Sequence, residues 1–512
     1  MDVAETEAKL AAGPITAFAL TAIALHLLTN LFSAYGVHRD EFLYLAMGRH
    51  LDLFRMEFPP AIAILARISM LFGDSLAAIR IFPALAAGAL VAMAGLIAAQ
   101  MGGGRRAQLL AAGCVLMNPL FLRAGNLFQP VVFDQLTWTV GLYALVRLGR
   151  TANPRYWILY GIAVGLGLLT KFSALFFGTA TLAALIVSRE RRWLATPWPW
   201  LAMLLVCVIG SPSWIGQIRL GFPVLQQMSD LRESQLERVT AAEFLIGQAL
   251  LGPGFLIACV GVYWLLRDPR AQGLRVVGWT CVFAFLILLG LKGKPYYLGP
   301  IYPALFAAGA LTLERPRAGS TLSALRIAAA AVLVSAYGLV LLPIGIPILP
   351  PERMARYTEA IGASEANRTN TGELDRLPQD YADMLGWPEQ VAAVSEVYHS
   401  LPPAERQRAV VIAANYGEAG AIDFYGPALG LPRAVSTAGT YWFFGPGQKP
   451  GEVAVTVGIP PEELRKFFGD VRLVRSFTHP WSVAEERNTP IAVASHPYRT
   501  LQEVWPSQGG NN

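Results

Sequence analysis

Long runs of apolar residues alternate with short polar segments over the first two thirds of the chain. Such runs predict membrane-spanning helices, because about 20 apolar residues cross the hydrocarbon core of a bilayer as a helix. Some of the runs are shorter than a full span. We expect about eleven spanning helices, at 14–33, 78–100, 107–123, 132–148, 156–170, 172–188, 197–214, 242–266, 275–291, 296–313 and 321–345.

The apolar stretch Ala61–Phe72 is too short to span a bilayer. We interpret it as a helix that lies along the membrane surface. A second surface helix is predicted near residues 40–53. Both would belong to a long first loop that follows the first spanning helix.

The pattern changes at Pro350, where the apolar runs end. Residues 350–408 are polar and helix-prone. Beyond them, strands alternate with helices, which predicts a small α/β layer domain. The expected strands are Ala409–Ala413, Glu452–Val457, Val471–Phe477 and Ile491–Ala494, and the expected helices are Gln390–His399, Glu418–Phe424 and Pro461–Phe468. We therefore predict a membrane domain at 1–349 and a soluble domain at 350–512.

Composition supports this division. Hydrophobic residues make up 54% of the 512 residues and charged residues only 15%, whereas a soluble protein carries about 25% charged residues. The net charge of +6 comes mostly from arginine, which in a membrane protein is typical of cytoplasmic loops rather than of nucleic-acid binding. The four cysteines all lie in apolar runs, which argues against a disulfide framework and a cysteine metal site.

Arginines predict the topology. They form five clusters, one in every second loop: Arg105-Arg106, Arg147 to Arg155, Arg189 to Arg192, Arg267 to Arg275, and Arg315 with Arg317. The positive-inside rule makes these loops cytoplasmic. The N-terminus is then cytoplasmic and the domain from Pro350 extracytoplasmic. The first apolar run lacks a basic start and a cleavage site, so we interpret it as a retained helix rather than a signal peptide.

The outer loops combine carboxylates, cations and aromatic side chains. A site that activates a hydroxyl and holds a phosphate needs such a mixture, because a carboxylate takes the proton and cations stabilise the leaving group. The candidates are Arg39, Asp40, Glu41 and Glu57 in the first outer loop, Arg123 and Asp134 in the second, Lys171 in the third, and Lys292, Lys294, Tyr296 and Tyr297 in the fifth.

Each candidate also has an interpretation without chemistry. Asp40 and Glu41 fit the solvated start of a surface helix, and Lys171 fits a lysine that extends to the interface. The lysines and tyrosines of the fifth loop fit interface anchors and an aromatic belt. Gly161 and Gly165 lie about one helical turn apart, which predicts close helix packing.

Taken as a set, these motifs resemble those of the polyprenyl-phosphate-sugar-dependent glycosyltransferases of the C fold. This group includes the protein O-mannosyltransferases (glycosyltransferase family 39) and the aminoarabinose transferases of lipid A. The resemblance covers nearly all of residues 14–345. It rests on Arg39-Asp40-Glu41 with Tyr44, Arg49-His50-Leu51, Glu57-Phe58-Pro59-Pro60, Phe133-Asp134 with Trp138, Gly167–Ser173 around Lys171, and Lys292–Tyr297. The clearest block of the tail, Asn415–Gly426, is similar to bacterial members of the group.

The resemblance implies roles for several residues. Asp40 would be the general base, supported by Glu41, and Asp134 would be a second acidic group near the acceptor. Phe58 stands where the aminoarabinose transferases have a phosphate-binding lysine. Phosphate binding then falls to other residues, for which the candidates are Lys171, Lys292, Lys294, Tyr296, Tyr297, Arg39 and Arg123. No cofactor is required, although a divalent ion held by Glu57 with Asp40 or Asp134 stays open.

The resemblance further implies an inverting transfer of a sugar from a polyprenyl-phosphate donor to the hydroxyl of a glycan, lipid or protein acceptor. It places the enzyme in a bacterial inner membrane, with chemistry on the outer face. Two alternatives stay open: a lipid-linked sugar flippase or transporter, and a non-catalytic factor of envelope-glycan assembly. Against a transporter, the charges gather at one membrane face and no internal repeat is apparent.

Overall fold

The computed structural model describes residues 8–315, 322–369 and 372–509. The chain divides into two compact units. Unit 1 comprises residues 1–32, 53–62 and 73–346, and unit 2 comprises 33–52, 63–72 and 347–512. Two segments of the predicted first loop are therefore grouped with the C-terminal residues, although the sequence analysis assigned them to residues 1–349.

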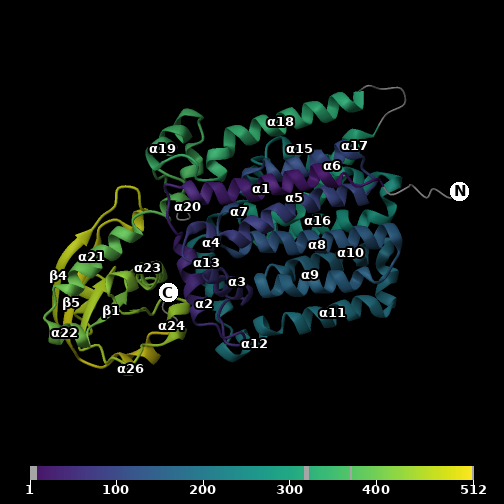
Figure 1. Ribbon diagram of the computed structural model, residues 1–512. Helices are drawn as coiled ribbons and strands as arrows, with labels where there is room; N and C mark the ends of the chain where they lie inside the picture. Colours follow the sequence, from purple (N-terminus) through teal and green to yellow (C-terminus); the bar gives the residue numbers. More distant parts are fainter. Residues whose placement is uncertain (1–7, 316–321, 370–371, 510–512) are drawn as a thin grey trace. The chain divides into compact units, whose positions relative to one another are not determined.

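Unit 1 is built from apolar helices, most of which run side by side (Figure 1). Its α-helices are α1 (Ala12–Phe32), α4 (Leu76–Ile79), α5 (Ile81–Gln100), α6 (Arg105–Leu116), α7 (Pro119–Asn126), α8 (Pro130–Thr151), α9 (Tyr156–Thr170), α10 (Ala174–Val187), α11 (Pro197–Ile209), α12 (Ser211–Leu220), α13 (Pro223–Ser234), α14 (Ala241–Ala249), α15 (Pro253–Arg267), α16 (Arg275–Gly290), α17 (Tyr302–Glu314) and α18 (Leu322–Gly345). Short 3-10 helices are η2 (Arg189–Ala195), η3 (Leu236–Arg238), η4 (Pro269–Leu274) and η5 (Pro295–Ile301).

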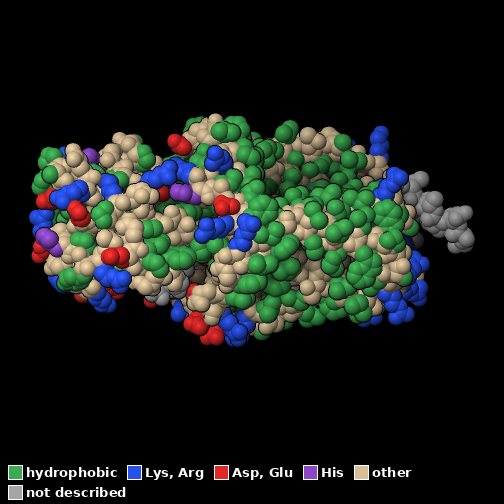
Figure 2. Space-filling view, turned by 90° about the horizontal axis from the view of Figure 1, so that it is seen from below, with side chains coloured by type: hydrophobic (Ala, Val, Ile, Leu, Met, Phe, Trp, Pro, Cys, Tyr) green, Lys and Arg blue, Asp and Glu red, His purple; other side chains and the backbone are tan. Residues whose placement is uncertain are grey.

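Judged by length and composition, fewer helices of the structure qualify as membrane spans than the sequence predicted. Among the described residues, four helical segments are long and apolar enough to cross a membrane, or up to seven if each bent pair forms one span. The predicted count of eleven is not confirmed. The chain is nevertheless a multi-pass membrane protein, and apolar side chains cover most of the face of this unit that Figure 2 shows.

Two predicted spans are broken helices. The run 107–123 forms α6 and α7 with a bend of 59°, and the run 242–266 forms α14 and α15 with a bend of 102°. Each second helix begins with a proline, Pro119 or Pro253, which fits the first turn of a helix but cannot continue one. Expecting straight helices was wrong here because an apolar run does not reveal where a new helix starts.

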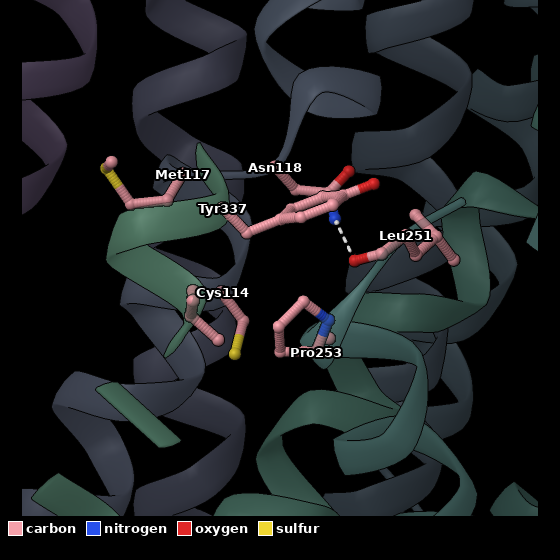
Figure 3. Close-up of a pocket in the computed structure, with 8 residues that line it drawn as sticks. Cys114, Met117, Asn118, Leu251, Pro253 and Tyr337 are labelled. Atoms are coloured by element: carbon pink, nitrogen blue, oxygen red, sulfur yellow. Dashed lines mark hydrogen bonds between the residues drawn. The ribbon is translucent and has the colours of Figure 1, made fainter. Parts of the chain in front are cut away.

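Side chains satisfy the backbone at these breaks. The Asn118 amide donates to the Leu251 carbonyl at 3.3 Å, and the Tyr337 hydroxyl donates to the Leu250 carbonyl. Figure 3 shows Asn118 and Tyr337 lying together beside Leu251, around a cavity of about 10 Å³. Backbone groups without helical partners are costly inside a bilayer unless they find other partners. These two contacts therefore hold α6, α14 and α18 at a fixed junction.

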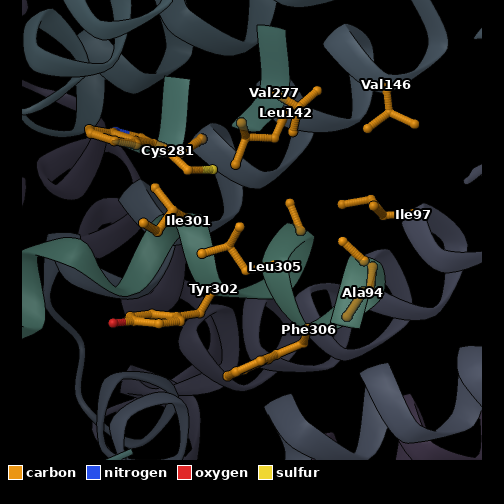
Figure 4. Close-up of a cluster of buried hydrophobic side chains, with 14 of the residues drawn as sticks. Ala94, Ile97, Leu142, Val146, Val277, Cys281, Ile301, Tyr302, Leu305 and Phe306 are labelled. Carbon is orange, nitrogen blue, oxygen red and sulfur yellow. The ribbon is translucent and has the colours of Figure 1, made fainter. Parts of the chain in front are cut away.

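The core of unit 1 lies where α5, α8, α16 and α17 meet. Figure 4 shows their apolar side chains pointing toward one another, from Ile97, Leu142, Val277 and Leu305 among others. On α9, a Cβ added to Gly161 would lie 2.8 Å from the backbone of α11, and one added to Gly165 would lie 2.9 Å from the Ile209 side chain. The predicted packing role of these glycines is confirmed.

The basic loops lie at one end of unit 1. The Glu314 carboxylate at the end of α17 accepts from the backbone amides of Gly104, Arg106 and Ala107 at the start of α6. The end of α8 meets η4 through Gly149 and Gly273, and Trp157 at the start of α9 meets Trp193 of η2 at 6.0 Å. The Arg315 guanidinium lies 5.0 Å from the centre of the Trp264 ring near the end of α15. The described parts of the five arginine loops are thereby gathered together, as the alternation along the sequence predicts, and Arg317 lies outside the described residues.

Unit 2 contains a five-stranded mixed sheet in the order β2-β1-β3-β5-β4. The strands are β1 (Val410–Ala413), β2 (Ala434–Val435), β3 (Val453–Val457), β4 (Phe468–Phe477) and β5 (Thr489–Pro497). Strand β1 is parallel to β2 and β3, whereas β5 is antiparallel to β3 and β4. The central strand β3 is buried along its whole length, and the edge strand β4 is mostly exposed. The predicted α/β domain is thus present.

The helices of unit 2 include two that lie against the sheet, α21 (Trp387–His399) and α23 (Tyr416–Tyr425), both drawn beside it in Figure 1. The others are α2 (Arg39–Arg49), α19 (Pro351–Ala360), α20 (Gln379–Ala382), α22 (Pro403–Arg408), α24 (Thr440–Phe444), α25 (Pro461–Leu464) and α26 (Leu501–Val504), with η1 (Met70–Phe72), η6 (Ser364–Asn367), η7 (Gly426–Leu429), η8 (Ala484–Glu486) and η9 (Trp505–Ser507). The remaining helix, α3 (Ala61–Ser69), has residues in both units.

Two details of the sheet differ from the sequence prediction. Strand β2 was not predicted, because two residues give no alternating pattern. The helix expected at Pro461–Phe468 ends at Leu464, and β4 already begins at Phe468. Leu464 and Phe468 are buried in the same apolar cluster, so Phe468 fits the pattern of either element.

Helix α2 packs tightly against α23 within unit 2. A Cβ on Gly420 would lie 2.4 Å from the Phe42 Cβ, and one on Gly417 would lie 2.7 Å from the Arg39 side chain. Phe42 also meets the Trp387 ring at 5.8 Å. The small residues of the Asn415–Gly426 block therefore make room for the helix that carries Asp40.

Candidate functional site

In unit 1, Asp134, Lys171 and Ser173 form a polar cluster. The Ser173 hydroxyl donates to Asp134 Oδ1 at 2.7 Å, and the Lys171 ammonium interacts electrostatically with the same carboxylate. Lys171 Nζ also lies 4.3 Å from the centre of the Tyr297 ring and 5.8 Å from that of Tyr296, within cation–π range. Four residues predicted from three loops are thus brought together, and Ser173 joins them.

This cluster lies at the end of unit 1 opposite the basic loops. Asp134 is in the first turns of α8, whose other end carries Arg150. Lys171 follows α9, which begins at the basic end. Asp134 is buried and Lys171 half-buried. A lysine beside a carboxylate and aromatic rings remains a potential donor to a phosphate oxygen.

The other candidates of unit 1 are more dispersed. Lys292 is exposed, and its ammonium lies 3.5 Å from the Glu237 carbonyl. Lys294 directly precedes η5, and Arg123 is in the last turn of α7. Glu57 is buried, and its backbone carbonyl accepts from the Gln217 amide at 2.6 Å.

In unit 2, Asp40 lies in the first turn of α2 and has a tyrosine partner. The Tyr416 hydroxyl donates to Asp40 Oδ1 at 2.9 Å. Burial and the neighbouring Asp40 raise the pKa of Tyr416 well above 10, so the hydroxyl keeps its proton and remains a donor. The Arg39 guanidinium lies 5.0 Å from the centre of the same tyrosine ring. Asp40 is thereby held in one orientation.

Glu41 caps α2. Its carboxylate accepts from the His38 backbone amide at 2.8 Å, while the His38 ring accepts from the Asp40 amide at 3.1 Å. This reciprocal capping box satisfies two backbone donors at the helix start. Glu41 is fully buried. Glu41 therefore fixes the start of the helix that carries Asp40.

His38, Asp380 and Asp383 form a group of metal-ligand type, because one ligand atom from each lies within 4.8 Å of the others. The His38 ring does not fit a metal in this arrangement. Its Nδ1 accepts a hydrogen bond, so Nε2 carries the proton and has no lone pair to give. Nε2 faces Asp383 Oδ2 at 3.8 Å and Asp380 Oδ1 at 4.0 Å, both beyond hydrogen-bond distance. Glu57 is not part of this group.

Asp383 is buried beside these charges. Burial raises the pKa of its carboxyl to about 7, against the opposing effect of His38 and Arg39. Its backbone carbonyl accepts from the Arg39 amide at 3.1 Å. Asp383 therefore contacts both residues that precede Asp40 and fixes the approach to α2.

Three residues of these clusters were not predicted. Ser173 was part of the quoted motif around Lys171 but was given no role. Tyr416 lay in the noted tail block, yet its pairing with Asp40 joins residues separated by 376 positions. Asp383 lies in a polar segment without any motif. A local pattern cannot signal such contacts, because nothing in it specifies the distant partner.

The chain has the ArnT fold. It is similar to the crystal structure of ArnT from Cupriavidus metallidurans bound to undecaprenyl phosphate. The match covers 94% of this chain and 98% of that chain, with a TM-score of 0.60 and 16% sequence identity. The apo structure of the same protein gives a TM-score of 0.62 at the same identity and coverage. The predicted resemblance to C-fold enzymes is confirmed at the level of the fold.

A family model gives a second similarity. Residues 57–215 match the model of the dolichyl-phosphate-mannose-protein mannosyltransferases. This segment contains Glu57, Asp134 and Lys171. No curated protein sequence matches the chain.

Proposed function

We propose that this protein is a glycosyltransferase that moves a sugar from a polyprenyl-phosphate donor to an acceptor hydroxyl on the outer face of the membrane. The acceptor oxygen attacks C1 of the sugar while its proton passes to the Asp40 carboxylate. The bond between C1 and the phosphate oxygen breaks, its electron pair stays on the phosphate, and C1 is inverted. Proton transfer to a placed carboxylate contributes about 10²- to 10⁴-fold in rate.

The observation that carries this proposal is the Asp134–Lys171–Ser173 cluster, which lies in a bundle of mostly apolar helices. Charged groups in membrane segments are expensive, and their usual reason is function. A cation beside aromatic rings suits the phosphate of a lipid donor. The ArnT structure that shares this fold is bound to undecaprenyl phosphate, and the matching family model describes transferases that use a lipid-phosphate sugar.

Asp40 suits the role of base because its surroundings hold it in place. Tyr416 fixes one carboxylate oxygen, and the capping box formed by His38 and Glu41 fixes the start of α2. Asp134 would act as the second acidic group. The proposed topology places the arginine loops in the cytoplasm of a bacterial inner membrane, so the Asp134–Lys171 cluster lies outside.

One residue of the first outer loop narrows the choice of donor sugar. Phe58 occupies the position of the phosphate-binding lysine of the aminoarabinose transferases. We therefore assign the phosphate to Lys171 and expect a donor other than aminoarabinose. Envelope glycans are the acceptors we favour, and comparing envelope glycans by mass spectrometry with and without the gene would identify the product.

The proposal is tested with purified protein in liposomes that contain undecaprenyl phosphate-linked mannose and an envelope glycan extract. Release of undecaprenyl phosphate that depends on the extract is measured. Asp40→Asn should lower this rate at least 100-fold, because the amide cannot take the proton. Tyr416→Phe should lower it about 10-fold, because a charge-assisted hydrogen bond is worth about 1.5–3 kcal/mol.

Asp74→Asn is the matched control, since Asp74 is an exposed aspartate of unit 1 outside both clusters, and it should release lipid phosphate at the wild-type rate. Near-wild-type release by Asp40→Asn would exclude Asp40 as the base. Transport of intact donor without release would instead favour the flippase alternative.

A further inference from the structure

Unit 2 contains a cavity of about 310 Å³, and Asp40 is not among the residues that line it. Its walls come from the residue after α2, the strands β1 and β2, helix α24 and the Gly445–Lys449 loop. Its charged and aromatic lining residues are His50, Asp423, Arg433, Tyr441, Phe444 and Lys449. Its volume is at the lower end of the range of small-molecule sites, about 300–1,000 Å³.

The cavity has an excess of positive charge. Arg433 is exposed, and its guanidinium interacts electrostatically with the Asp423 carboxylate without a direct hydrogen bond among the described residues. The Lys449 ammonium donates to the Ala409 carbonyl at 2.9 Å, which uses one of its three hydrogens. Both cations can therefore bind an added anion without losing a partner.

The carboxylate in the wall is already satisfied. Asp423 Oδ1 accepts from the Ala434 amide at 2.9 Å, and Oδ2 accepts from the Tyr441 hydroxyl at 3.1 Å. Asp423 is buried, and burial raises the pKa of its carboxyl. Whether or not it is ionised, Arg433 and Lys449 outnumber it. The arrangement favours an anionic ligand over a neutral or cationic one.

Aromatic rings provide the apolar part of the wall. The His50 and Phe444 rings are stacked, with centroids 4.2 Å apart and planes at 14°, and Tyr441 meets Phe444 at 5.1 Å. Burial, together with Arg433 and Arg49, lowers the pKa of His50, so its ring is neutral at pH 7. The C–H face of a sugar ring packs well on such flat surfaces, while the neutral imidazole can bond to a hydroxyl.

We propose that this cavity binds a negatively charged sugar unit of the acceptor glycan, with Arg433 and Lys449 on the anionic group and the His50–Phe444 pair under the ring. The acceptor part of this assignment rests on the proposed function. Binding to the cavity does not, since it needs neither a donor nor turnover. The site would give specificity for glycans that carry a carboxylate or a phosphate.

The test measures binding to full-length protein in detergent with three probes of the same size class: glucuronate, glucose 6-phosphate and glucose. At least one of the two charged sugars should bind at least 10-fold more tightly than glucose. The preferred one then distinguishes a uronate from a phosphorylated unit. The double variant Arg433→Gln/Lys449→Gln should reduce this binding at least 10-fold.

The matched control is Arg465→Gln, because Arg465 is an exposed arginine of the same unit outside the cavity. It should bind like the wild type. Phe444→Leu, which keeps an apolar side chain, should weaken the charged sugars and leave inorganic phosphate unaffected. Equal affinity for glucose and both charged sugars would overturn the proposal, and so would unchanged binding in the double variant.

The lipid-release assay separates this assignment from the proposed function. Charged-sugar binding without any release of lipid phosphate would contradict the glycosyltransferase proposal and leave the cavity assignment intact. Extract-dependent release that the double variant retains in full would contradict the acceptor role of the cavity and leave the glycosyltransferase proposal intact.

Discussion

Asp383 is buried among charged neighbours, and its ionisation is coupled to the stability of unit 2. Its pKa of about 7 in the folded protein exceeds its ordinary value of 3.8 because burial disfavours the charged form. Between these two pH values the folded protein binds more protons than the unfolded chain. This contribution to stability is therefore complete below about pH 4 and is lost as the pH rises to about 7.

Asp383→Asn should remove this pH dependence, because asparagine does not titrate. The melting temperature of the wild type should fall between pH 4.5 and 8 relative to that of the variant. The free-energy difference is at most about 4 kcal/mol, at about 1.4 kcal/mol for each pKa unit. Glu462→Gln, at an exposed position of the same unit, is the control. Parallel melting curves for wild type and Asp383→Asn across this range would contradict the assignment.

For single residues, the sequence indicated which charged side chains are candidates but not which residues they contact. Asp40, Asp134 and Lys171 stand out because a charge beside apolar runs needs a reason. The predicted topology placed Lys171 and Tyr297 at one membrane face but did not predict their contact. Tyr416 could not be predicted, because a tyrosine in a soluble domain carries no signal of which distant carboxylate it contacts.

Among the elements, the apolar helices were predicted well and their breaks were not. Helix α9 covers Tyr156–Thr170, as expected. The runs that form α6–α7 and α14–α15 stay apolar across each break, so hydrophobic length alone joins two helices into one. The prolines at the start of α7 and α15 were the available signal, since proline is frequent in the first turn of a helix.

The junction of the broken helices should depend on Asn118. Asn118→Ala removes the donor to the Leu251 carbonyl and the cap of α7. Loss of a helix cap costs about 1 kcal/mol, and an unsatisfied buried carbonyl costs about 1–3 kcal/mol more. The variant should unfold at a lower temperature in detergent. Asn118→Ser keeps a neutral capping oxygen but loses the amide that reaches Leu251, so its loss should be intermediate. Equal stability of all three proteins would contradict this account.

At the scale of the whole molecule, the alternation of arginines predicted which helix ends share a side. The structure gathers the described parts of the five basic loops at one end of unit 1 through contacts such as that of Glu314 with the start of α6. The grouping of residues 33–52 with the C-terminal unit was not foreseen. A hydrophobic pattern predicts the local element in which a residue lies. It does not predict contacts between segments that are hundreds of residues apart, such as this one.

The proposed orientation can be tested by labelling single cysteines, after the four native cysteines are replaced by alanine. Arg191→Cys lies in η2 at the basic end, and Ser229→Cys lies in α13, beyond the opposite end of α11; both positions are exposed. A membrane-impermeant maleimide should label Ser229→Cys in spheroplasts and Arg191→Cys only after lysis. The reverse pattern would invert the topology.

The grouping of α2 with the C-terminal residues has a consequence for biosynthesis. Chains are made from the N-terminus, and their parts fold as they emerge. Asp40 is made early, but its partner Tyr416 follows 376 residues later. The segment that carries the proposed base must therefore remain without its final contacts until nearly the whole polypeptide has been translated. A nascent or prematurely terminated chain would contain the membrane bundle and a complete Asp134–Lys171 cluster. It would lack the Tyr416 hydroxyl that orients Asp40.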